Sequence, residues 1–63
     1  MDYSGMTVNE RLFEAGLLDK FTEAAHKRDR ELLISILKEV KLEQKQAEET
    51  VSTLLKDPKF YGY

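Results

Sequence analysis

The chain has 63 residues, carries a net charge of −2 and contains no cysteine. This length corresponds to one domain at the small end of independent folding, and the lack of cysteine excludes disulfides, thiolate metal sites and cysteine nucleophiles. No apolar run approaches the roughly 18 residues of a membrane span, and the N-terminus has neither the basic start nor the apolar stretch of a signal peptide. We therefore expect a cytoplasmic protein that does not enter the membrane.

A short first helix is predicted after residues 1–6, which we expect to form a flexible lead-in. Thr7 and Glu10 have the spacing of a capping box, in which each side chain accepts a hydrogen bond from the other residue's backbone N–H. Gly16 suits the left-handed conformation that ends many helices. The alternative is one helix that continues through Gly16, at a cost of about 1 kcal/mol. Residues 7–63 are predicted to form a single helical domain.

The second helix is predicted to start at Leu17 and Leu18 and to end near Arg28, where cations suit the negative end of the helix dipole. Asp29 is then placed to cap a third helix, over about residues 30–40. Apolar side chains recur along that stretch at the spacing of one helix face, and flanking apolar residues widen the face to roughly 200°. A helix so apolar requires neighbours on two sides, so we predict that it is the central helix.

A loss of periodicity at residues 41–43 predicts the next break, and a final helix is expected over about residues 43–56. Asp57 and Pro58 end it, because the residue before proline avoids the helical conformation. We predict an all-α fold, a compact bundle of three to four short helices. The expected core consists of Leu12, Leu18, Phe21, Leu33, Ile36, Leu37, Val40, Val51, Leu54 and Leu55.

The sequence offers little that could carry out chemistry. His26 is the only histidine and is expected to be exposed at a helix end. Ser35 lacks the Gly-x-Ser-x-Gly context of a nucleophile, and no phosphate-binding, dinucleotide-binding or calcium-binding motif is present. We therefore expect no catalytic, metal or cofactor site, no small-molecule substrate, and a protein that is not an enzyme.

Two groups of residues are candidates for contact with a partner. The first is the aromatic tail, with Phe60, Tyr61 and Tyr63, which is too apolar to remain solvated. We expect it to fold back near the first helix and Phe13; the alternative is that it docks on a second copy. The second group is the basic cluster of Lys27, Arg28 and Arg30. The simpler interpretation of this cluster is that a helix C-terminus prefers cations.

Several stretches together resemble a group of short, uncharacterised bacterial proteins that are all-helical. They are residues 9–13 (NERLF), 15–19 (AGLLD), Phe21, residues 28–30 (RDR), Ile36 and Leu37, and residues 57–58 with 61–62 (DP and YG). The resemblance covers most of residues 6–62. It implies a small helical cytosolic protein whose natural start is Met6, and it implies no activity.

From these features we predict a small non-enzymatic interaction module that presents a helix face or the aromatic tail to a protein partner or to another copy of itself. The alternative is a small nucleic-acid-binding regulator, in which the last two helices act as a helix-turn-helix. Carboxylates at residues 43, 48 and 49 would repel phosphates, and the usual turn glycine is missing, so nucleic acid is the less favoured partner.

Overall fold

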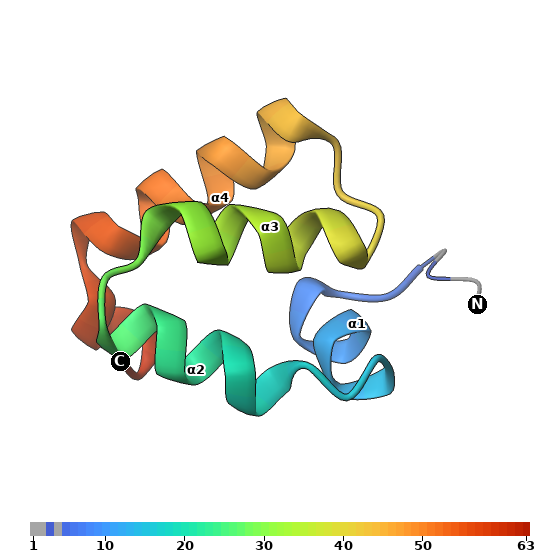
Figure 1. Ribbon diagram of the computed structural model, residues 1–63, viewed down its shortest axis with the longest axis horizontal. Coiled ribbons are helices and arrows are strands. Elements are labelled where there is room, and N and C mark those ends of the chain that lie inside the picture. The colour runs from blue at the N-terminus through green and yellow to red at the C-terminus, as the bar shows by residue number, and fades with distance from the viewer. Residues whose placement is uncertain (1–2, 4) are drawn as a thin grey trace.

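The computed structural model describes residue 3 and residues 5–63, and in this part of the chain it contains helices and no strand (Figure 1). The predicted all-α bundle is confirmed, with four α-helices. They are α1 (Val8–Glu14), α2 (Leu18–His26), α3 (Arg30–Glu39) and α4 (Gln44–Lys56), followed by a short 3₁₀ helix, η1 (Pro58–Tyr61). None of the described helices combines the length and the apolar character needed to cross a membrane.

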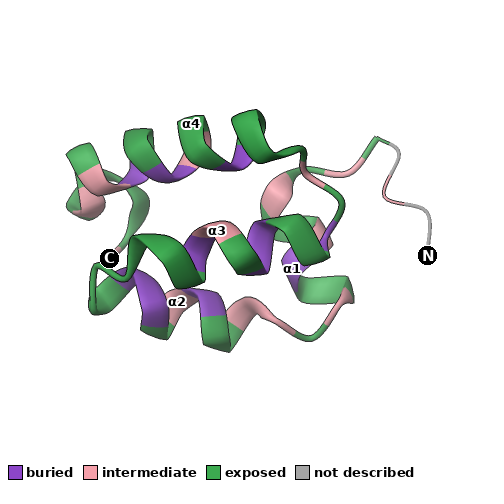
Figure 2. Cartoon of the chain, turned by 45° about the horizontal axis from the view of Figure 1, so that its top comes forward, coloured by how far each residue is buried: buried purple, intermediate pink, exposed green. Residues whose placement is uncertain are grey.

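The centre of the fold is α3, which lies between α2 on one side and α4 on the other (Figure 1). Its side chains Leu33, Ile36 and Leu37 are fully or almost fully buried, as is Val40 at its C-terminal end. The purple inner faces of α2, α3 and α4 meet in Figure 2, whereas their outer faces are exposed. The prediction of a central helix with neighbours on two sides is therefore confirmed.

The core differs from the predicted one at its edges. Leu18 and Leu55 were expected inside but are only half-buried, and both pack against the margin of the cluster. Alanines that were not in the predicted core are buried instead, and their small side chains let neighbouring helices approach closely. The buried residues are Leu12, Phe21, Ala24, Ala25, Leu33, Ile36, Leu37, Val40, Ala47, Val51 and Leu54.

The predicted helix ends are formed by local hydrogen bonds. The Glu10 N–H donates to Thr7 Oγ1 over 3.2 Å, and the Thr7 N–H donates to Glu10 Oε1 over 3.1 Å, so the capping box is confirmed. Asp29 caps α3 by accepting a bond from the Leu32 N–H. Gly16 is left-handed, with φ +71°, so one continuous helix through it is ruled out.

The break between α3 and α4 has an unexpected cause. Lys41 adopts the left-handed conformation, with φ +72°, although it is not glycine. Glu43 then begins α4, and its N–H donates to Oε1 of Gln46 over 3.3 Å. The loss of periodicity predicted this break correctly, but neither the left-handed Lys41 nor the Glu43 cap was predicted from the sequence.

A long-range hydrogen bond joins α1 to the end of the central helix. Nη1 of Arg11 donates to the Val40 carbonyl oxygen over 3.1 Å, at the negative end of the α3 dipole. The Arg11 guanidinium carbon also lies 5.7 Å from the ring centre of Tyr3, which is half-buried against the core. Residues 1, 2 and 4 of the predicted flexible lead-in lie outside the described residues.

Replacing Leu37 by alanine should lower the free energy of unfolding by about 2–5 kcal/mol, because it removes fully buried methyl groups and leaves a cavity. Leu32→Ala is the matched control, since Leu32 lies on the same helix with 42% of its surface exposed. Urea titration followed by circular dichroism measures both. If the two variants had equal urea midpoints, α3 would bury a different face from the one that contains Leu37.

Candidate functional site

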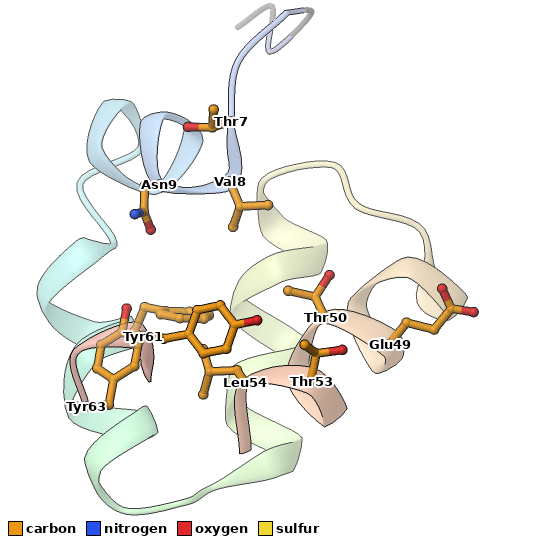
Figure 3. A pocket seen from close by; sticks show the side chains of 10 residues that line it. Thr7, Val8, Asn9, Glu49, Thr50, Thr53, Leu54, Tyr61 and Tyr63 are labelled. Carbon is orange, nitrogen blue, oxygen red and sulfur yellow. The ribbon is translucent and has the colours of Figure 1, made fainter. Parts of the chain in front are cut away.

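A hollow of about 590 Å³ opens between the start of α1, the middle of α4 and the C-terminal segment (Figure 3). We call it the α1–α4 groove. Two core residues, Phe21 and Leu54, line it as well. Its other main lining residues are Val8, Asn9, Thr50, Thr53, Tyr61 and Tyr63.

The groove exists because α1 packs mainly on α2 and leaves its first turn apart from α4. The chain leaves α1 through the left-handed Gly16, and the Leu17 N–H donates back to the Leu12 carbonyl over 2.9 Å. This tight turn fixes the direction of α1 relative to α2. In Figure 3, Val8 and Asn9 point from α1 toward the rings of Tyr61 and Tyr63 across the opening.

The other wall is built by the chain after α4. Pro58 restarts the backbone as η1, and Gly62 reverses it with φ +87°. The Tyr63 N–H then donates to the Pro58 carbonyl over 2.9 Å. As a result Tyr63 packs edge-on against Phe21 and His26, with ring centres 6.2 and 6.0 Å apart.

The tail therefore folds back on its own chain, and the predicted place is right only in part. It was expected near the first helix and Phe13: Tyr61 and Tyr63 border the start of α1 across the groove, but Tyr63 packs on α2 and Phe13 remains 69% exposed. The physical reason is reach: the 3₁₀ turn and the reversal at Gly62 leave Tyr63 beside the end of α2. Tyr61, two residues earlier, borders the groove opposite α1.

The three aromatic residues that were predicted to contact a partner have different environments in the structure. Tyr63 is half-buried and holds the tail on α2. Phe60 and Tyr61 stay exposed, at 78% and 45%, and their rings meet edge-on with centres 5.0 Å apart. Two aromatic side chains that the core does not use thus remain available at the surface.

The three basic residues lie at the junction of α2 and α3 and are engaged within the chain. Lys27 Nζ pairs with Glu23 Oε1 over 3.0 Å, and its hydrogen bond and charge lower the pKa of that carboxyl. Arg28 donates to the Ala25 carbonyl oxygen at the end of α2. Arg30 donates to Ser52 Oγ on α4 over 2.9 Å. These contacts agree with a structural role for the cluster.

Sequence reasoning missed the outer face of α1. A second hollow, of about 350 Å³, adjoins the groove at Asn9 and is lined also by Met6, Phe13 and Leu18. Asn9 and Val8 face the groove from the same helix. The available signal was Phe13 itself, a large apolar side chain next to the buried Leu12 on a helix too short to bury both.

Within residue 3 and residues 5–63, no three acidic or histidine side chains gather as a metal site would require. The expectation of no cofactor stays a prediction.

Comparison with known proteins gives no match, whether to a family model, to a curated protein or to a solved structure. The resemblance to short bacterial all-helical proteins therefore stays a prediction that rests on the residues quoted for it.

Replacing Tyr63 by alanine should lower the free energy of unfolding by about 1–2 kcal/mol, because it removes the edge-on contacts with Phe21 and His26. Phe60→Ala should have little effect, since that ring is mostly exposed. Thermal melts at several protein concentrations measure both. A loss for Tyr63→Ala that grows with protein concentration and shrinks on dilution would mean that the tail docks on a second copy instead.

Proposed function

We propose that the chain is a small, non-enzymatic, cytoplasmic protein-interaction module that binds a segment of another protein along the α1–α4 groove. One observation carries this proposal: an open hollow bordered by the exposed ring of Tyr61 and the half-buried ring of Tyr63 remains after the core has closed. Exposed apolar surface around a concavity marks contact sites, because leaving apolar side chains in water does not stabilise the monomer.

The lining of the groove suits a protein segment. Tyr61 offers a large contact area with few rotatable bonds, which is why tyrosine is enriched at interfaces. Asn9 and Thr53 add hydrogen-bonding groups on opposite walls. The groove also meets the second hollow at Asn9, so the concave surface extends around α1 instead of closing about one small molecule.

The alternative function, nucleic-acid binding through α3 and α4, has weaker support. The surface of α4 includes the exposed carboxylates of Glu48 and Glu49, and Glu43 precedes it. These charges repel phosphates. The basic cluster of Lys27, Arg28 and Arg30 is engaged in contacts within the chain.

Tyr61→Ser should abolish binding of the natural partner, because it removes the aromatic border of the groove. Leu32→Ser is the matched control: Leu32 is exposed to a similar degree, 42% against 45% for Tyr61, but it lies on α3 and does not line the groove. Both variants and the unchanged chain are immobilised and exposed to lysate of the native host, and captured proteins are compared by mass spectrometry.

The proposal requires a captured protein that Tyr61→Ser loses and Leu32→Ser keeps. Circular dichroism confirms that both variants remain folded. If both variants capture the same set as the unchanged chain, the groove is not the contact surface.

A further inference from the structure

We infer that the segment bound along the α1–α4 groove is positively charged and amphipathic, and that it belongs to a different protein. This inference rests on the proposed function and specifies the chemistry of the partner. It comes from the distribution of charge around three hollows that meet at α1.

The three hollows adjoin one another around α1. The groove shares Asn9 with the second hollow, and it shares Val8, Glu49 and Thr50 with a third hollow of about 270 Å³. Met6 lines both the second and the third hollow. Apolar side chains therefore follow one another around the first turn of α1, which provides a strip that can receive the apolar face of a partner segment.

Acidic side chains border this strip. Glu49 lies at the edge of the groove and points away from the tyrosines in Figure 3. Glu10 and Glu14 line the second hollow. Within the described residues, the one ion pair joins Glu23 and Lys27, so neither Glu14 nor Glu49 is neutralised by a described cation.

The only cation on these linings is Arg11, and it is occupied. Its guanidinium donates to the Val40 carbonyl and lies over the ring of Tyr3. Its Nε atom is buried. Three carboxylates, those of Glu10, Glu14 and Glu49, stand against this one guanidinium, so the charge that a partner meets along the strip is negative. Lysine or arginine side chains flanking an apolar face would complement it.

A second copy of the chain is a poor occupant. In a symmetric dimer the same surface patch contacts itself, so Glu14 and Glu49 of one copy would face the same carboxylates of the other. Juxtaposed like charges oppose association. A head-to-tail contact that used the basic cluster at the α2–α3 junction would have to compete with the contacts that Lys27, Arg28 and Arg30 make within the chain.

The favoured geometry is an amphipathic helix lying in the groove, with apolar anchors toward Val8 and Tyr61 and cationic residues toward Glu14 and Glu49. The test uses two synthetic amphipathic peptides of identical pattern, one of leucine and lysine and one of leucine and glutamate. Each is labelled with fluorescein and titrated with the protein, and binding is followed by fluorescence anisotropy. The lysine peptide should bind, and the glutamate peptide should bind at least about tenfold more weakly.

Charge reversal on α4 then locates the site. Glu49→Lys should weaken binding of the lysine peptide by about three- to tenfold. The lysine side chains of the peptide are attracted by the carboxylate of Glu49 and would be repelled by a cation at that position. Glu48→Lys is the matched control: it makes the same change of net charge at the neighbouring exposed residue, which lines none of the three hollows. This control should leave the affinity within about twofold of the unchanged chain.

Three results would overturn the inference: no binding of the lysine peptide, equal binding of both peptides, or equal losses for Glu49→Lys and Glu48→Lys. Sedimentation that shows a dimer lost on Tyr61→Ser would also overturn it, in favour of self-association. The proposed function fails separately, when Tyr61→Ser and Leu32→Ser capture the same host proteins. If a host protein is lost with Tyr61→Ser but still captured with Glu49→Lys, the groove remains the contact surface and only the positive charge of the partner is refuted.

Discussion

The burial of α3 on two sides is the constraint on which the rest of the structure depends. The core side chains of α3 and its C-terminal end are buried only because α2 and α4 cover opposite sides of this one helix. They are Leu33, Ile36, Leu37 and Val40. A chain this short buries only about 60% of the surface exposed when it is unfolded. Once α2 and α4 are committed to α3, what remains is a short α1 across one end and a short tail at the other.

The core is too small to bury every apolar side chain, and this limit explains the surface of the protein as well as its interior. Phe13 and Phe60 are as apolar as the buried residues, yet both stay mostly exposed because no core space remains for them. The same packing leaves three carboxylates on the linings around α1, those of Glu10, Glu14 and Glu49, where Arg11 is the one lining cation. An apolar strip with an acidic border is the consequence.

Local features could be predicted from the sequence and long-range ones could not. The period of α3, the Thr7–Glu10 capping box, the Asp29 cap and the stop at Gly16 depend on residues a few positions apart, and all four are confirmed. The docking of Tyr63 on α2 depends on residues far apart in the sequence, and its expected location near Phe13 was wrong. The groove was missed for the same reason, because it results from the angle at which α1 meets the bundle.

The central claim is that the concave surface around α1 receives a cationic segment. Nuclear magnetic resonance measures it most directly, by titrating the lysine peptide into isotopically labelled protein and mapping which backbone amides shift. The account predicts that the largest shifts fall at Val8, Asn9, Thr53 and Tyr61, on the walls of the groove. Shifts concentrated instead at the α2–α3 junction, or spread evenly over the surface, would contradict it.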